Sequence, residues 1–173
     1  MRPVFVFKKV MKSIKLPDRV KALTDYIDKK SAVADIGTDH GYLPVYLAQT
    51  GLAGRIIASD ISAGSLESAH RSATRHKVAE SIEFIVAPGL SGIMPSDVDT
   101  IVIAGLGGET IVDILKDASW TRTQNIKLLL QPQSKIDVLC RFLYDNGYTI
   151  EDTKTVPDRK RLYTVIHASY NEG

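Results

Sequence analysis

The sequence contains very little cysteine and no long apolar run. A single cysteine among 173 residues excludes the internal disulfide framework that holds many small secreted domains together. No apolar stretch approaches the roughly 18 residues of a membrane-spanning helix. The Phe5–Phe7 run is also too short for the core of a signal peptide. We therefore expect a cytoplasmic protein that does not associate with membranes.

The few histidines and the one cysteine form no metal-binding pattern. His70 and His76 are six residues apart, a spacing that does not place both on one helix face. Cys140 lies between Leu139 and Leu143, where a buried packing role is expected. We expect neither a bound metal nor cysteine-based catalysis.

Basic residues are concentrated at the start of the chain. Seven of the first 24 residues are Lys or Arg and only Asp18 is acidic, although the net charge of the whole chain is +2. Such a segment is typical of nucleic-acid binding, and a solvated tail is the plainer alternative. We expect a basic N-terminal arm over residues 1–15. One domain should follow over residues 16–173, a length ordinary for a single domain.

The rest of the chain is organised around residues 31–50, SAVADIGTDHGYLPVYLAQT. An apolar run ends in Asp35, a glycine turn follows, and a helix-like stretch begins near Pro44. This strand–turn–helix unit opens nucleotide-binding α/β domains. The turn carries Asp39 in place of a phosphate-cradling glycine. A carboxylate there repels pyrophosphate but suits a ligand with a cationic end, such as S-adenosylmethionine. A plain turn without a ligand is the alternative.

Strand-like and helix-like segments alternate along the chain. Strands are expected at 32–35, 55–59, 81–86, 99–104 and 127–131, helices at 16–27, 65–76, 109–116 and 134–146, and a closing antiparallel hairpin at 148–156 and 161–169. Ser134 can cap the last helix. The strand at 99–104 is the most apolar and should be central. The alternation predicts a Rossmann-like α/β fold, a doubly wound and mostly parallel sheet of seven strands with a C-terminal antiparallel hairpin.

In such sheets the ligand binds outside the carboxyl ends of the strands. This rule brings five parts of the chain into one crevice: 35–41, Asp60, 88–90, 104–108 and 131–132. Asp60 ends the second strand, where a carboxylate can accept both hydrogen bonds of a ribose diol. A helix cap is the alternative role for Asp60.

The loop after the fourth strand excludes two kinds of base methylation. Methylation of an exocyclic amine uses Asn or Asp followed by Pro-Pro-aromatic, whereas this loop reads Ala104-Gly105-Leu106-Gly107. Carbon-5 methylation of a pyrimidine needs a cysteine nucleophile, and Cys140 lies mid-helix. A ring nitrogen needs only positioning and a group that later accepts a proton. Asp39 is the first candidate for that group, with binding of the cofactor's amino group as its alternative role. His40 should contact substrate, with a local structural hydrogen bond as the alternative.

Four segments carry a family resemblance. They are ADIGTDHGYLP (34–44), the Ala-Ser-Asp-Ile step (58–61), DTIVIAGLGG (99–108) and LLLQPQ (128–133). They resemble the bacterial tRNA (adenine-N1)-methyltransferases that act on adenine 22 in the D-arm. The resemblance runs from about Leu16 to Ser169. It implies a class I methyltransferase fold, S-adenosylmethionine as cofactor, and tRNA as the partner that is methylated at N1 of an adenine.

The resemblance also implies roles for individual positions. The cofactor would be bound by Asp35, Gly37, Thr38, Asp39, Gly41, Asp60, Ile61, Gly89, Leu90 and Ala104. The substrate would be bound by His40, Gly105, Gly107, Gly108, Gln131 and Pro132. Independently of the resemblance, the position of Asp39 in the turn, which aims it into the crevice, makes it the catalytic residue that we expect.

The sequence departs from the family at several places. Pro88 stands where the family usually has Asp, Gln133 where it often has Asn, and Thr164 where Glu is common. Family members also continue into a C-terminal helical hairpin that helps to grip tRNA, whereas this sequence ends at Gly173. We therefore expect a chain without that extension. A small-molecule methyltransferase and a non-catalytic S-adenosylmethionine-binding protein of the same fold are the alternatives.

Overall fold

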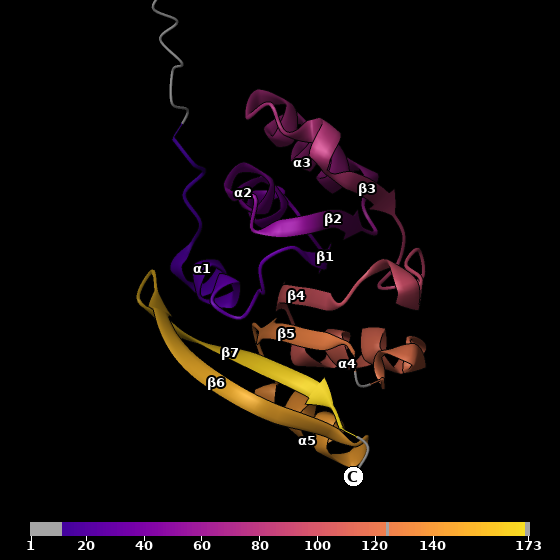
Figure 1. Cartoon of the computed structure of the whole chain (residues 1–173). Coiled ribbons are helices and arrows are strands. Elements are labelled where there is room, and N and C mark those ends of the chain that lie inside the picture. Colours follow the sequence, from indigo (N-terminus) through magenta and orange to yellow (C-terminus); the bar gives the residue numbers. More distant parts are fainter. Residues whose placement is uncertain (1–11, 124, 172–173) are drawn as a thin grey trace, which may run out of the picture.

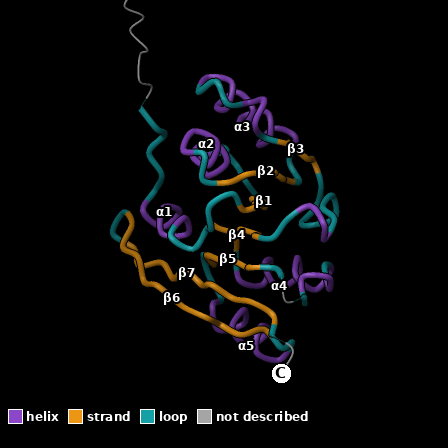
Figure 2. The backbone as a smooth tube through the Cα atoms, viewed as in Figure 1, coloured by secondary structure: helices purple, strands orange, loops and turns teal. Residues whose placement is uncertain are grey.

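The computed structural model describes residues 12–123 and 125–171, which form a seven-stranded sheet with helices on both faces (Figures 1 and 2). The strand order is β3-β2-β1-β4-β5-β7-β6. The strands are β1 Ser31–Ile36, β2 Ala53–Asp60, β3 Glu83–Val86, β4 Thr100–Leu106, β5 Lys127–Pro132, β6 Tyr148–Asp158 and β7 Arg161–Tyr170. The helices are α1 Asp18–Thr24, α2 Tyr42–Thr50, α3 Ala63–Arg75, α4 Gly108–Asp117 and α5 Ile136–Asp145, with short 3₁₀ turns η1 Ala79–Ser81, η2 Pro95–Asp97 and η3 Ser119–Thr121.

The first five strands are parallel, and β7 joins β5 in the antiparallel sense. The doubly wound, Rossmann-like prediction with its C-terminal antiparallel hairpin is therefore confirmed. Strand β4 is central, as its apolar sequence predicts. Its side chains alternate between two cores, because neighbouring residues of a strand point to opposite faces. Ile101 and Ile103 pack with α4 and α5, whereas Val102 packs with α1, α2 and α3.

Several predicted boundaries differ from the structure. The helix expected at 16–27 covers only Asp18–Thr24, although Leu16 and Ile27 are both buried beside it. Apolar spacing thus marks the buried side of this segment beyond the helix itself. The predicted cap at Ser134 is wrong: α5 begins after Lys135, which has a left-handed backbone (φ 53°) and makes no side-chain cap. The carbonyl of Ser134 instead accepts a hydrogen bond from the amide of Gly108 at 2.8 Å.

The β6–β7 hairpin extends well beyond its neighbour β5. Pairing between β5 and β7 ends at Leu130 and Ile166, whereas β7 begins five residues earlier at Arg161. The free part of the hairpin lies beside α1 (Figure 1). Tyr26 just after α1 donates its hydroxyl to Asp152 of β6 at 2.7 Å. The hairpin therefore contacts both β5 and the region of α1. Its tip lies on the side where β5 ends.

Three further predictions concern a membrane span, a metal site and the N-terminal arm. Within the described part of the chain, no helix is long and apolar enough to cross a membrane. The same residues contain no cluster of His, Cys, Asp or Glu that could hold a metal ion. Of the basic arm predicted at 1–15, residues 1–11 lie outside the described residues, while Lys12 and Lys15 are exposed.

Candidate cofactor site and active site

A cavity of about 1110 Å³ lies at the carboxyl ends of β1, β2 and β4. Its volume exceeds the roughly 300–1,000 Å³ of most small-molecule sites, so a cofactor would leave room for part of a second ligand. Eleven of the predicted site residues line it: Asp35, Gly37, Thr38, Asp39, His40, Asp60, Ile61, Gly89, Leu90, Ala104 and Gly105. The switch-point rule thus located the cavity from sequence.

The turn between β1 and α2 is fixed to the end of β2 by backbone hydrogen bonds. The amides of Gly37 and Thr38 both donate to the carbonyl of Ser59, at 2.8 and 3.2 Å. The amide of Asp39 donates to Oδ2 of Asp60 at 3.3 Å. Gly37 and Asp39 have positive φ, 72° and 53°, a region where glycine and Asp are favoured over other residues. The turn is therefore held in place before any ligand binds.

Gly41 belongs to the same turn but does not line the cavity. Its φ is 71°, and a Cβ added there would lie 2.8 Å from the Cβ of Ala69 in α3. Real Cβ atoms do not approach so closely. The requirement for glycine at this position therefore comes from the packing of the turn against α3.

Asp35 is the most deeply buried acid of the cavity, with 6% of its surface exposed. Burial raises the pKa of its carboxyl to about 6, and the charge of Asp60 adds to the rise. The Thr38 hydroxyl opposes it, although that hydroxyl is itself buried without a hydrogen bond of good geometry. A buried carboxylate with a raised pKa is stabilised by a cation placed beside it. Asp35 therefore favours a positively charged ligand.

Asp60 ends β2 with its carboxylate directed at two backbone amides. Oδ1 accepts a hydrogen bond from the amide of Ser62 at 2.8 Å, and Oδ2 accepts one from Asp39. Asp60 is not the cap of α3, because the hydroxyl of Ser62 fills that role by accepting from the amide of Ser65. Each carboxylate oxygen can accept a second hydrogen bond. Asp60 is thus held in place and retains the capacity to bind a diol.

Asp39 and His40 present exposed side chains at the cavity. Oδ2 of Asp39 lies 3.6 Å from Nε2 of His40, and the side chains are 71% and 56% exposed. Nδ1 of His40 lies 3.2 Å from the hydroxyl of Ser68. The local hydrogen bond considered for His40 therefore exists, and Nε2 still faces the neighbouring carboxylate.

The charges around the cavity are mostly negative. Among the described residues, six carboxylates line it against two guanidinium groups: Asp35, Asp39, Asp60, Asp113, Asp117 and Asp158 against Arg19 and Arg159. No lysine from that part of the chain belongs to the lining. Sites for nucleotide phosphates rely on glycine amides and cations. This cavity therefore suits a cationic ligand far better than a dinucleotide.

Four residues predicted to bind substrate do not line the cavity: Gly107, Gly108, Gln131 and Pro132. Gly108 is buried, and a Cβ there would lie 2.2 Å from the carbonyl oxygen of Lys135. Gln131 is fully buried, donating from Nε2 to the carbonyl of Pro132 at 3.0 Å. Gln133, two residues further on, lines the cavity instead. The buried glycine thus joins the start of α4 to the segment before α5, whereas the side chain of Gln131 bonds within the end of β5.

One wall of the cavity was not predicted from the sequence. It comes from the start of α1 and from the hairpin tip: Pro17, Arg19, Val20, Asp158, Arg159 and Tyr163. These residues carry no motif, and their place depends on how far β6 and β7 extend beyond β5. The charged turn Asp158-Arg159-Lys160 was the one signal in the sequence that pointed to this wall.

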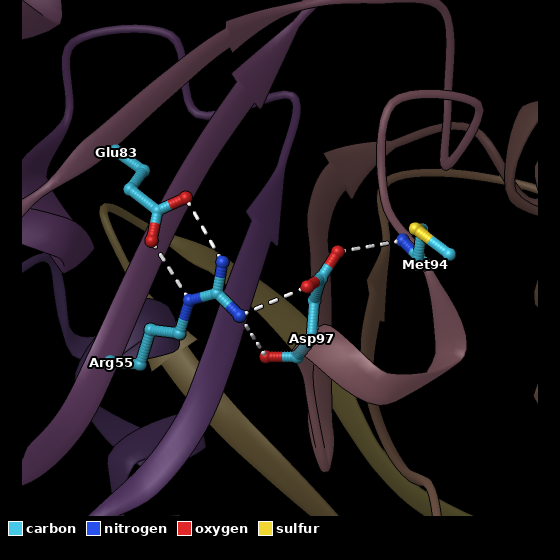
Figure 3. A network of polar contacts seen from close by, with 4 residues as sticks. All are labelled: Arg55, Glu83, Met94 and Asp97. Carbon is cyan, nitrogen blue, oxygen red and sulfur yellow. Dashed lines mark hydrogen bonds and ion pairs between the residues drawn. The ribbon is translucent and has the colours of Figure 1, made fainter.

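An ion-pair network outside the cavity joins β2 and β3 to the turn η2 (Figure 3). Arg55 of β2 forms two hydrogen bonds to Glu83 of β3, at 2.8 and 3.1 Å, and a third to Asp97 of η2 at 3.0 Å. The other oxygen of Asp97 accepts from the amide of Met94 at 2.9 Å. That amide, followed by Arg55, lowers the pKa of Asp97. The network fastens the η2 end of the segment 87–97, whose other end brings Gly89 and Leu90 to the cavity.

Replacing Arg55 with Met should loosen this segment while the sheet stays intact. The side chain is exposed, so methionine is tolerated, but Glu83 and Asp97 lose their shared partner. We expect amide hydrogen exchange in residues 87–97 to become roughly tenfold faster, with β1 and β4 unchanged. Arg141→Met, an exposed arginine on α5, is the control. Equal exchange in the two variants would show that the network does not hold the segment.

Comparisons with known proteins place this geometry in a family. A family model described as a methyltransferase domain matches residues 16–166. The tRNA (adenine(22)-N(1))-methyltransferase of Bacillus subtilis is 32% identical over 158 residues, which cover 91% of this chain and 66% of that protein. The crystal structure of the B. subtilis M1A22 tRNA methyltransferase TrmK has a TM-score of 0.87 and 31% identity, covering 92% of this chain and 68% of that one.

A third relative was solved with a ligand. The structure of M. capricolum TrmK in complex with S-adenosyl-homocysteine has a TM-score of 0.80 and 27% identity, covering 91% of this chain and 70% of the other. The chain spans about two thirds or less of the length of the curated relatives that it matches first. The match over residues 16–166 includes every element from α1 into β7. The chain therefore belongs to the methyltransferase-domain family and shares its fold with bacterial tRNA (adenine(22)-N(1))-methyltransferases.

Proposed function

We propose that this chain is an S-adenosylmethionine-dependent methyltransferase that acts in the cytoplasm on N1 of an adenine in tRNA, adenine 22 of the D-arm. The observation that carries the proposal is the acid-lined cavity, in which Asp35, Asp39 and Asp60 converge at the end of β1 and β2. Three carboxylates, with no lysine from the described residues beside them, suit a ligand with a sulfonium and an ammonium group. The B. subtilis relative supplies the substrate class, and the M. capricolum structure, which contains S-adenosyl-homocysteine, supports the cofactor.

The residues of the cavity fit this cofactor. Asp60 retains free lone pairs for a ribose diol, and Asp35 is a buried carboxylate without a cationic partner among the described residues. The buried Thr38 hydroxyl has no hydrogen-bond partner in the protein, and a ligand could supply one. When bound, S-adenosylmethionine would supply an electrophilic methyl group, whose bond to sulfur would break as the lone pair of adenine N1 bonds to the methyl carbon, with S-adenosylhomocysteine as the leaving group.

The chain's own residues would then position the base and manage its charge. Methylation at N1 leaves adenine cationic, and a nearby carboxylate stabilises that charge or accepts the extra proton. Asp39 is the residue that we assign to this role, because its carboxylate is exposed at the cavity while its amide is tied to Asp60. N1 lies on the pairing edge of the base, so the adenine must leave its stem before it can react.

Transfer of label from S-adenosylmethionine to bulk bacterial tRNA tests the proposal. We expect 1-methyladenosine in tRNA, and none in a transcript whose adenine 22 is replaced by guanine. Label found only in small molecules would support the small-molecule alternative. Cofactor binding without any transfer would support a non-catalytic protein. Calorimetry with S-adenosylmethionine, S-adenosylhomocysteine and NAD adds an independent check, since binding of NAD alone would contradict the cofactor assignment.

A further inference from the structure

We propose that the tip of the β6–β7 hairpin grips the phosphate backbone of RNA at the mouth of the cavity. The basic tip consists of Arg159, Lys160 and Arg161. The inference rests on the proposed function, since it names the element that holds the same substrate. Of the three residues of the basic tip, only Arg159 lines the cavity.

The strand pairing places the basic tip at the cavity. Asp158 pairs with Arg161, so Arg159 and Lys160 form a two-residue loop. The tip lies five residues beyond the last pair between β7 and β5. Arg159 lines the cavity, as do Asp158 before it and Tyr163 after it, while Lys160 and Arg161 are exposed. All three cations are therefore exposed, and one of them also lines the cavity.

Contacts with α1 hold the hairpin in this position. Nε of Arg19 lies 3.8 Å from Oδ2 of Asp158, whose side chain is 11% exposed. The guanidinium of Arg19 also lies over the ring of Tyr163, 5.6 Å from its centre. Asp158 is thus engaged by Arg19 and does not neutralise the tip. Among residues 12–123 and 125–171, none of the three cations of the basic tip forms an ion pair.

The backbone of the loop makes these residues unusual. Arg159 and Lys160 both have positive φ, 45° and 66°, the sign pattern of a type I′ hairpin turn. Asn-Gly and Asp-Gly are favoured there because they adopt positive φ most readily. Folding alone would favour those residues. Two long cations at these positions indicate that charge at the tip has a use.

The charges of the cavity and of the basic tip together complement a nucleic acid chain. The charged residues that line the cavity are mostly carboxylates, so the cavity disfavours an anionic group but admits a neutral base. The rim carries the basic tip, which favours phosphates that remain outside. A base that enters the cavity while its own backbone stays at the rim satisfies both regions. A neutral planar base on every unit of an anionic backbone is the chemistry of a nucleic acid, so we assign the basic tip to RNA.

A charge-matched pair of double variants tests the inference. Lys160→Asn with Arg161→Thr removes two cations from the basic tip, and Asn accepts the positive φ of Lys160. Lys30→Asn with Lys29→Thr is the control. The control removes two exposed cations just before β1, at the end of the strand away from the cavity. The φ of Lys30, 65°, is nearly the same as that of Lys160, 66°. Binding of bulk tRNA is measured against KCl concentration in the presence of S-adenosylhomocysteine.

We expect the tip variant to bind tRNA about tenfold more weakly at low salt. Its slope of log affinity against log salt should fall by about 1–2, roughly 0.7–0.9 for each phosphate that the protein no longer neutralises. The control should keep the slope of the unmodified protein, and both variants should bind S-adenosylhomocysteine equally. Equal slopes in the tip variant and the control would overturn the inference.

The inference and the proposed function fail in different ways. If the protein methylates tRNA, but the tip variant has the same KM for tRNA and the same salt dependence of tRNA binding as the unmodified protein, the inference is wrong and the function stands. If tRNA binds through the basic tip but receives no methyl group, the inference stands and the function is wrong. If S-adenosylhomocysteine binds but tRNA does not bind at all, both are overturned.

Discussion

Replacing Asp39 with Asn is expected to slow methyl transfer about 100-fold or more while affinity for S-adenosylhomocysteine stays nearly unchanged. Asn removes the negative charge that would stabilise the methylated, cationic adenine. It should preserve the turn, because Asn tolerates the positive φ of 53° at this position. The backbone amide that donates to Asp60 is also retained. Single-turnover kinetics with saturating cofactor would measure the transfer step directly.

Two comparisons make this result specific. Asp145→Asn removes an exposed carboxylate at the end of α5, so it controls for the change in net charge. Calorimetry with S-adenosylhomocysteine separates binding from transfer. If Asp39→Asn loses cofactor affinity but transfers methyl normally once the cofactor is bound, Asp39 is a binding residue. The proton-accepting group would then have to be sought elsewhere in the cavity.

Much of the fold could be predicted because its signals are local. Five apolar strands, each followed by a helix or a turn, give a doubly wound sheet whatever the details of packing. The glycine turn after Asp35 and the carboxylate at Asp60 also depend on short spacings along the chain. The crevice follows from a general rule about the carboxyl ends of parallel strands. All of these features can be read from short stretches of sequence.

The features that could not be predicted depend on residues far apart in the chain. Gly108 begins α4 at the end of a glycine-rich sequence that resembles a ligand-binding turn, but its lack of a side chain is required by the carbonyl of Lys135. Gln131 carries the chemistry of a base contact, yet it is fully buried. Arg159 reaches the cavity only because the hairpin extends beyond β5. Composition and periodicity do not show which residues far apart in the chain come into contact.

The affinity for cofactor should fall as pH decreases through about 6, because Asp35 must be ionised to stabilise a cationic ligand. Burial raises the pKa of Asp35 from 3.8 to about 6. Well below that value, each further pH unit should weaken binding by about tenfold, provided that the ligand's own charge is constant. Asp35→Asn should bind about 10- to 100-fold more weakly at pH 8, the worth of one charged hydrogen bond. Its affinity should then be nearly independent of pH between 5 and 8.

The same substitution should stabilise the protein when no cofactor is bound. The pKa of Asp35 is higher in the folded protein than in the unfolded chain, so the folded state binds more protons between about pH 4 and 6. The free energy of unfolding attributable to Asp35 therefore decreases as pH rises through this range. Above pH 6 the ionised group lowers the free energy of unfolding by about 3 kcal/mol relative to its neutral form, which corresponds to two pKa units of difference.

Urea unfolding should show Asp35→Asn to be more stable than the unmodified protein at pH 8, with the gain shrinking towards pH 4. A less stable variant at pH 8 would mean that Asp35 is stabilised by the fold itself. The gain in stability and the loss of cofactor affinity would together identify Asp35 as a residue retained for binding at the expense of stability.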